Sequence, residues 1–353
     1  MISYGINIKP FLNKSKDIIT VSRVVALLSI VCAHCSMVND DVSISTRFIG
    51  GFFQCFGPWG VSLFFFISGM LFARNNKKFG AFWRGKAFSL FIPWFFCSTV
   101  VYLYVSLRKD SFDLVDCILS VLGYSSSFWF CFSLVLIYMI LFALPKNKAS
   151  CVFLVVLSLS YRIPLGLGMF PKNNFFAYIN PLNWLWIFCI GMLCTNLLCV
   201  IVEEKANKVG AFFATFIVSL IALLFVLGWN SYKGIYVSYT HIFYVFIALL
   251  FVVFGITLSA VLVNYRKITS VLKWVGERSF SVYLLHELGF AGLITNLCSR
   301  VDSPIFVIIR PFLVICFCLL AIELGRWGAG VIGMSRFYAL LVGSRFVKDG
   351  VEK

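Results

Sequence analysis

Charged residues are scarce in this chain, and acidic residues are the scarcest of them. Charged residues make up 12% of the 353 positions, and only 14 residues are Asp or Glu. Soluble domains contain about 25% charged and about 45–50% apolar residues, whereas 61% of this chain is hydrophobic. Long apolar stretches recur from end to end, which excludes a soluble domain with a single anchor and indicates a polytopic membrane protein.

Histidine is rare as well, and the cysteines form no pattern that suggests ligands. The sequence has three histidines and 13 cysteines. The cysteines are scattered within apolar segments, as in the examples Cys131, Cys189, Cys194, Cys316 and Cys318. We interpret them as small buried apolar residues and expect no metal site.

The positive net charge of +16 does not require a nucleic-acid partner. The basic residues lie in short loops between apolar segments, where the positive-inside bias of membrane proteins places them. Such loops also attract anionic headgroups and anionic cytosolic ligands. We therefore expect a lipid bilayer as a partner, and no nucleic acid.

Runs of roughly 20 apolar residues, the length that crosses a bilayer as a helix, recur about ten times. The sequence therefore predicts an all-α polytopic membrane protein with about ten transmembrane helices. The fifth predicted span is short, and residues 110–123 are polar enough to indicate an interfacial helix. The predicted spans are 18–38, 50–73, 87–106, 128–145, 150–163, 182–202, 209–229, 240–263, 279–298 and 304–324.

The basic loops alternate along the chain, so both termini are predicted to face the cytoplasm. The first apolar run is too long for a signal peptide, and no cleavage site follows it. No loop is long enough for a soluble domain, which needs about 50 residues or more. We expect one membrane domain over residues 1–353, with a core at about 17–326 and a cytoplasmic tail at 327–353.

Two polar residues bound the apolar run RVVALLSIVCAH. Arg23 and His34 are eleven positions apart, which is within ~20° of three full helical turns, so both project from one face about 16 Å apart along the axis. Arg23 is expected near the cytoplasmic end, where an arginine snorkels at low cost. His34 is expected to be buried toward the outer side, either as a general base or as a histidine bonded to a neighbouring carbonyl.

Two adjacent segments carry further candidates. Ser68 and Gly69 end an apolar run, GVSLFFFISGMLFAR, and predict a close approach of another helix. The basic loop RNNKKFGAFWRGKAF follows at residues 74–88. It is either a topology signal or a cradle for a phosphorylated ligand, with Arg84 and Lys86 best placed to reach a cavity.

A third segment, VGERSFSVYLLHELGF, combines Ser279, Tyr283 and His286 on one helix face at spacings of four and three residues. Glu287 points about 100° away from His286. His241 is expected at the membrane interface. Near the end of the last span, Glu323 and Arg326 are expected to pair with each other.

These motifs, in this order, resemble the acyltransferase 3 family of integral membrane acyltransferases. The resemblance covers residues 17 to about 326. The residues that carry the resemblance, motif by motif, are Arg23 and His34; Phe64, Phe65, Ser68 and Gly69; Pro93; Trp129 and Phe130; Gly191 and Met192; Gly276, Ser279, Tyr283 and His286; and Glu323. Two departures stand out. The family's usual Arg-x-x-Arg motif reads Lys86 then Ser89, so the second cation is missing or comes from Arg84, and Gly325 replaces a proline after Glu323.

The resemblance implies transfer of an acyl group, commonly acetyl from acetyl-CoA, to a hydroxyl of an extracytoplasmic carbohydrate such as O-antigen, peptidoglycan, capsule, exopolysaccharide or a periplasmic glucan. It implies a multi-pass protein of the bacterial inner membrane with acyl-CoA as donor substrate and no bound cofactor. We expect His34 as the catalytic residue, either as a base or as an acyl carrier, with Arg23, Arg84 and Lys86 at the donor, and Ser68, Tyr283 and His286 shaping the site.

A transporter or flippase of a glycan or lipid-linked sugar is the alternative from another class. Ten spans and a basic inner face would suit it. However, such proteins often show inverted repeats and mid-membrane carboxylates, and the sequence shows no repeat and few acidic residues in its spans, Glu287 apart. A structural scaffold, the third alternative, would tolerate substitution of Arg23 and His34.

Overall fold

The computed structural model of the chain is helical throughout the part that it describes, with no β-strand there. It describes residues 8–36, 42–124, 128–145, 147–171, 173–196, 209–233, 240–241, 243–286, 290–298 and 301–343. The α-helices are α1 (Ile8–Cys35), α2 (Ile44–Ala73), α3 (Phe79–Lys86), α4 (Ile92–Lys109), α5 (Leu114–Val121), α6 (Trp129–Ala143), α7 (Lys148–Gly166), α8 (Leu185–Leu193), α10 (Val209–Lys233), α11 (Tyr244–Leu262), α12 (Arg266–Glu277), α13 (Ser279–Leu285), α14 (Ala291–Cys298), α15 (Pro304–Val331) and α16 (Ser335–Val342).

Four short irregular helices interrupt this pattern. A π-helix, η1 (Ala87–Phe91), joins α3 to α4, and a second, η2 (Phe175–Ile179), precedes a 3₁₀ turn, η3 (Pro181–Asn183). Another 3₁₀ turn, η4 (Cys194–Asn196), ends α8. Wide π turns occur frequently at functional sites, and η1 lies in the segment where the sequence predicts the donor cations.

The described residues contain seven helices that are long and apolar enough to cross a membrane. These are Lys14–Cys35, Ile44–Ala73, Phe79–Lys109, Lys148–Gly166, Phe213–Lys233, Tyr244–Leu262 and Pro304–Val331. A polytopic membrane protein is thus confirmed, whereas the number ten and the orientation of the termini stay predictions. The fifth predicted span, expected to be short, is a 19-residue helix.

Three predicted spans differ from one long helix. Residues 128–145 form α6, which is too short to count among the seven. Residues 182–202 contain the nine-residue α8 between two 3₁₀ turns, and part of this range lies outside the described residues. Residues 279–298 divide into α13 and α14, on either side of positions 287–289, which also lie outside them.

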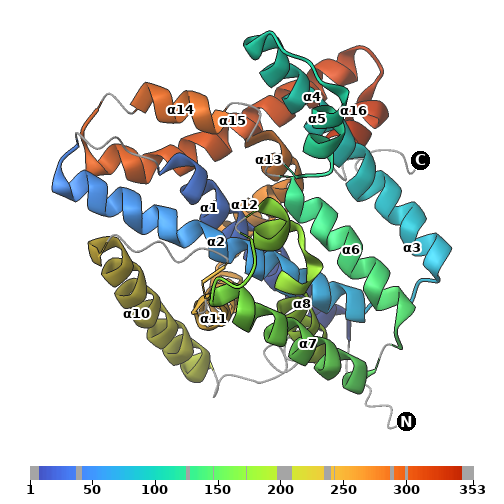
Figure 1. Cartoon of the computed structure of the whole chain (residues 1–353), viewed down its shortest axis with the longest axis vertical. Helices are drawn as coiled ribbons and strands as arrows, with labels where there is room; N and C mark the ends of the chain where they lie inside the picture. The colour runs from blue at the N-terminus through green and yellow to red at the C-terminus, as the bar shows by residue number, and fades with distance from the viewer. Residues whose placement is uncertain are drawn as a thin grey trace.

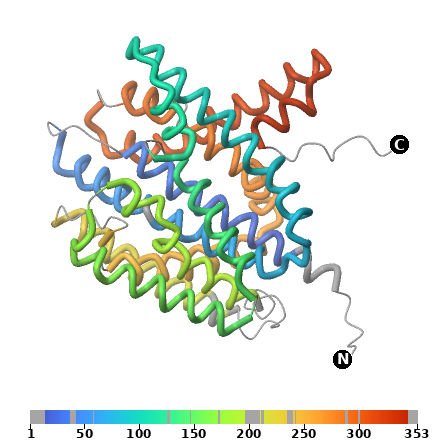
Figure 2. The backbone as a smooth tube through the Cα atoms, turned by 45° about the vertical axis from the view of Figure 1, so that its right-hand side comes forward, coloured from blue at the N-terminus to red at the C-terminus, as the bar shows by residue number. Residues whose placement is uncertain are grey.

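Helices α1 and α2 form the centre of the molecule (Figure 1) and pack on each other more extensively than any other pair. Several long helices, among them α1, α2 and α7, run in nearly the same direction (Figure 2). Hydroxyl groups join α1 and α2 to their neighbours, because Ser29 Oγ donates to the Phe56 carbonyl at 2.6 Å and Ser22 Oγ to Ser259 Oγ at 2.9 Å. Such hydrogen bonds between helices replace the hydrophobic drive that is missing in a bilayer.

Close backbone contact brings α8 onto α2. A β-carbon at Gly69 would lie 2.0 Å from the Phe188 carbonyl oxygen, and one at Gly191 would lie 2.1 Å from the Phe66 carbonyl oxygen. Only glycine fits such a crossing. The predicted close approach at Ser68 and Gly69 is therefore confirmed.

The segment predicted as a cytoplasmic tail contains packed structure. Helix α15 continues to Val331, and α16 packs against α4 and α15. The Ser281 hydroxyl on α13 donates to the carbonyl of Val342 at 2.6 Å. Residues 327–343 thus belong to the packed bundle, because a buried hydroxyl and the packed face of α16 hold them there.

The predicted interfacial segment and the cysteines named in the sequence lie as follows. Residues 114–121 of the predicted interfacial segment form α5, which is capped by Asp113. Of the named cysteines, Cys131, Cys189 and Cys318 are buried and Cys194 is half-buried, but Cys316 is exposed on α15. No group of three or more His, Cys, Asp or Glu side chains within the described ranges could hold a metal ion.

Candidate functional site

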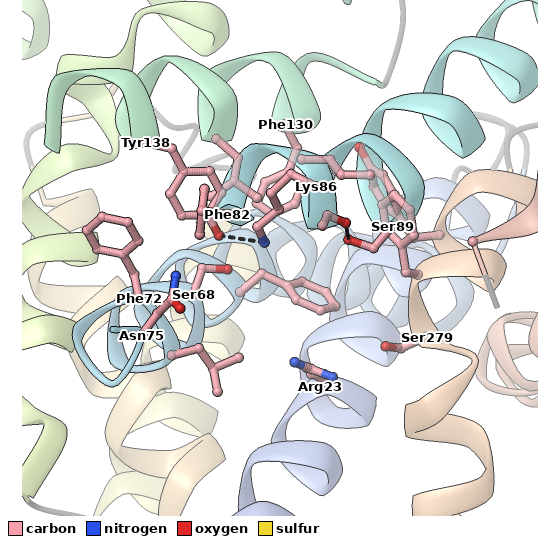
Figure 3. A pocket seen from close by; sticks show the side chains of 18 of the residues that line it. Arg23, Ser68, Phe72, Asn75, Phe82, Lys86, Ser89, Phe130, Tyr138 and Ser279 are labelled. Atoms are coloured by element: carbon pink, nitrogen blue, oxygen red, sulfur yellow. Dashed lines mark hydrogen bonds between the residues drawn. The ribbon is translucent and has the colours of Figure 1, made fainter. Parts of the chain in front are cut away.

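A cavity of about 590 Å³ lies beside α1, and four of the predicted site residues line it. Its walls come from α1, α2, α3, η1, α6, α12, α13 and Gly343 at the end of α16. The four are Arg23, Ser68, Lys86 and Tyr283, and Ser279 of the same motif as Tyr283 lines the cavity as well. Figure 3 shows Arg23 rising from α1 toward the space beneath Lys86.

The charge of this cavity is positive. Four cations line it, Arg23, Arg74, Lys77 and Lys86, against one carboxylate, Glu277. The exposed Lys77 marks its mouth at the loop between α2 and α3. We refer to it below as the basic cavity.

Aromatic side chains fix Lys86 at the wall of the basic cavity. Its Nζ donates to the Tyr138 hydroxyl at 3.2 Å (Figure 3), and lies 4.7 Å from the centre of the Tyr138 ring and 5.4 Å from that of Phe82. A cation held over two ring faces is stabilised while its apolar stem packs. The ammonium group of Lys86 is therefore held in a defined position at the cavity wall. Lys86 lies on the last turn of α3, where η1 begins.

Arg84 is separate from this group. It is exposed on α3 and does not line the basic cavity. Positions 84 and 86 differ by about 200° around a helix, so they cannot share a face. The expectation that both reach one cavity is corrected for this geometric reason.

His34 and His286 form an edge-to-face pair, with ring centres 5.1 Å apart and ring planes at 69°. His286 is fully buried, and its Nδ1 lies 2.6 Å from the Tyr283 carbonyl oxygen. A carbonyl oxygen only accepts, so Nδ1 donates its proton to it. The sequence expectation that His286 lies near His34 agrees with this arrangement.

His34 is exposed, which corrects the expectation of a buried histidine. It lies in the last turn of α1, which ends at Cys35, so no further turn covers it. Ile30, one turn earlier, lines the basic cavity, and Arg23 lines it two turns before that. The face predicted from the eleven-residue spacing therefore connects the cavity to the far end of α1.

Tyr283 lies between the basic cavity and the histidine pair. It lines the cavity, and its ring centre is 5.7 Å from that of His286 and 5.8 Å from that of Phe130. Gly276, in the same motif, lies where α12 meets α1, because a β-carbon there would be 2.4 Å from the Thr20 carbonyl oxygen. This contact holds the motif against the helix that carries Arg23 and His34.

Comparison with known protein families identifies the class of this bundle. Residues 17–323 match the acyltransferase domain of the acyltransferase 3 type, close to the whole extent of the motifs described above. The chain belongs to the acyltransferase 3 family. No curated protein and no solved structure matches the chain. It is therefore a membrane acyltransferase.

Two arginines of the acyltransferase contact Glu323, and the sequence predicted only one of them. Arg326 does pair with Glu323, at 3.8 Å, but Arg278 Nε approaches the other carboxylate oxygen at 2.7 Å. Arg278 is buried and also lies over the Trp274 ring at 4.3 Å. This pair ties the start of α13 to α15. A spacing of 45 residues gives no sequence signal for it.

Two buried arginines of the acyltransferase were also missed. Arg162 is buried in α7, over the Tyr244 ring at 4.9 Å, and donates to the Asn183 carbonyl at 3.3 Å. Arg310 is buried in α15 and donates to the Cys298 carbonyl at 3.0 Å. Asn183 ends η3 and Cys298 ends α14. Cations inside spans are rare and are normally paired with such groups.

His241 and Glu287 complete the sequence candidates. His241 lies just before α11, where its Nδ1 accepts from the Phe243 amide at 3.2 Å and its ring lies 5.6 Å from that of Phe243. Glu287 lies outside the described residues.

Proposed function

We propose that the acyltransferase takes an acetyl group from cytoplasmic acetyl-CoA and transfers it to a hydroxyl of an extracytoplasmic carbohydrate. The observation that carries this proposal is the basic cavity, which α1 borders through Arg23 and Ile30 on the face that continues toward His34. CoA is an anion with phosphates at one end and a thioester on a long arm. A cavity lined by four cations and seven aromatic side chains suits such a ligand.

The direction of the cavity supports entry from the side of the basic loop. Lys77 and Arg74 lie at the cytoplasmic end predicted for α2, and Ile30 and Tyr283 lie at the other end of the cavity. His34 is one helical turn beyond Ile30, or about 6 Å along the axis. The acetyl group at the tip of the pantetheine arm must therefore pass the Tyr283 ring to reach His34.

In the proposed reaction His34 acts as the general base. It takes the proton of the acceptor hydroxyl while the hydroxyl oxygen bonds to the thioester carbonyl carbon. The carbon–sulfur bond then breaks, and the thiolate of CoA takes up the proton from His34. Of the four cavity cations, Arg23 is the one that lies on α1, the helix that carries His34. Arg23 stabilises the oxyanion or the donor, while Lys86 binds the donor.

His286 is assigned as a positioning residue. Its proton on Nδ1 is held by the Tyr283 carbonyl, so its ring presents a fixed face to His34. A second possibility is that His34 itself carries the acetyl group between donor and acceptor. An acetyl-histidine intermediate would then be trapped by hydroxylamine.

The acceptor is proposed as a carbohydrate on the outer side of a bacterial inner membrane. The support is the exposure of His34 at the end of α1 opposite the basic loop, together with what the family resemblance implies. The family match alone gives the acyl transfer but neither the donor nor the acceptor.

The experiment uses purified full-length protein with acetyl-CoA and a thiol-reactive dye. We expect release of free CoA thiol that increases when an acceptor glycan is added, with an acetyl group on the glycan by mass spectrometry. Absence of thiol release with every acyl-CoA offered, in a protein that remains folded, would overturn the assignment of the donor. Glycan movement across vesicles without thiol release would favour the transporter instead.

A further inference from the structure

The Lys86–Ser89 motif before α4 supplies one cation to the basic cavity, whereas the family pattern that it resembles has two. Lys86 lines the cavity, and Ser89, at the position of the second cation, lines it as well. The Ser89 hydroxyl donates to the Gly85 carbonyl at 2.9 Å, within its own helix. Arg84 is exposed and outside the cavity wall. A donor with several phosphate groups therefore needs its second cation from another element.

Arg74 is the cation that the structure places there. It caps the end of α2 with right-handed helical backbone angles and lines the same cavity as Lys86. Its NH2 group donates to the Thr195 carbonyl in η4 at 3.1 Å. A guanidinium has five N–H donors, so one carbonyl does not exhaust it.

The fold explains why Arg74 has a fixed position. The glycine crossing of α2 and α8, at Gly69 and Gly191, brings the end of α8 beside the end of α2. The Thr195 hydroxyl donates to the Met192 carbonyl at 2.6 Å, which shapes the turn that offers its own carbonyl to Arg74. Arg74 is thus half-buried and held by a second helix, whereas Lys77 on the following loop is exposed.

We propose that Arg74, from the end of α2, replaces the missing second cation and binds a phosphate of the acyl-CoA donor together with Lys86. This inference rests on the proposed function of the basic cavity. The guanidinium offers a phosphate two parallel hydrogen bonds, and Lys86 offers a point charge from the opposite wall. Glu277, the one carboxylate of the cavity, comes from α12 and disfavours the phosphate near that wall.

The test compares two donors that share the reactive thioester. Acetyl-CoA carries the phosphates, and S-acetylpantetheine lacks them. For Arg74→Gln we expect kcat/KM for acetyl-CoA to fall about ten- to a hundredfold, the size expected for a hydrogen bond to a charged group. With S-acetylpantetheine the variant should match the wild type. The Gln amide can still donate to the Thr195 carbonyl, which preserves the fold, and Arg74→Lys should lose less.

Arg84→Gln is the matched control, and it should leave kcat/KM for both donors unchanged because Arg84 lies outside the cavity. An equal loss on both donors with Arg74→Gln, no loss on either, or a loss specific to acetyl-CoA in Arg84→Gln would each overturn the inference. Failure of the wild type to use either thioester would instead overturn the proposed function, so the two failures are distinguishable.

Discussion

At the scale of single residues, the proposed site divides into a donor half and a transfer half. Arg23, Lys86 and Ser68 line the basic cavity, and His34 pairs with His286 beyond it. Tyr283 belongs to both halves, because it lines the cavity and contacts the His286 ring. The two halves therefore should respond differently to substitution: donor residues through KM, and the histidines through kcat.

His286→Ala tests this division. We expect kcat for acetyl transfer to fall about a hundredfold, as for a misplaced catalytic group, with KM for acetyl-CoA unchanged because His286 does not line the cavity. Steady-state kinetics over a range of acetyl-CoA concentrations give both constants. His286→Asn keeps a donor for the Tyr283 carbonyl and should preserve the melting temperature. A variant that raises KM alone would contradict the positioning role.

The sequence predicted most of these residues but not their partners. Helix periodicity placed Arg23 and His34 on one face, and the structure agrees. It also grouped Arg84 with Lys86, although a two-residue step turns the side chains to different faces. Tyr138 was missed as a partner of Lys86 because it approaches from α6, 52 residues further along the chain. Arg74 belongs to the predicted basic loop but was not singled out within it. Exposure of His34 depends on where α1 ends, which composition alone does not determine.

At the scale of elements, two glycines determine how α8 meets α2. The backbones touch at Gly69 and Gly191, so α8, Thr195 and the contact to Arg74 depend on this crossing. Apolar runs predicted helices near every observed span. They did not predict the 3₁₀ turns at either end of α8, because such turns depend on packing rather than on hydrophobicity.

Gly191→Ala tests the crossing. A methyl group there would collide with the Phe66 carbonyl oxygen, and overpacking of this kind costs about 1–3 kcal/mol. Helix propensity alone would favour Ala over Gly by about 1 kcal/mol. The sign of the change in stability therefore distinguishes a steric collision from a propensity effect. The melting temperature in detergent should fall.

Gly292→Ala is the matched control for this substitution. No atom lies within 4 Å of the position of its β-carbon on α14, so its melting temperature should stay the same or rise. The account of the crossing fails if Gly191→Ala melts at or above the wild-type temperature.

At the scale of the whole molecule, the bundle places a basic cavity at one end and an exposed histidine toward the other end of α1. The distribution of Lys and Arg predicts that the cavity opens to the cytoplasm. Acyl transfer across the membrane then needs only the thioester, and not the whole donor, to pass Tyr283. The buried Arg162 and Arg310 show that positive charge also lies inside the bundle and not in its loops alone.

The most direct test of the account compares two histidine substitutions in cells that make the surface glycan. His34→Ala should lower glycan acetylation, measured by mass spectrometry, by about a hundred- to ten-thousandfold, the contribution of a general base. His241→Ala, at a histidine that neither lines the basic cavity nor belongs to the histidine pair, should leave it unchanged at equal membrane expression. Unchanged acetylation in His34→Ala would contradict the catalytic assignment of His34.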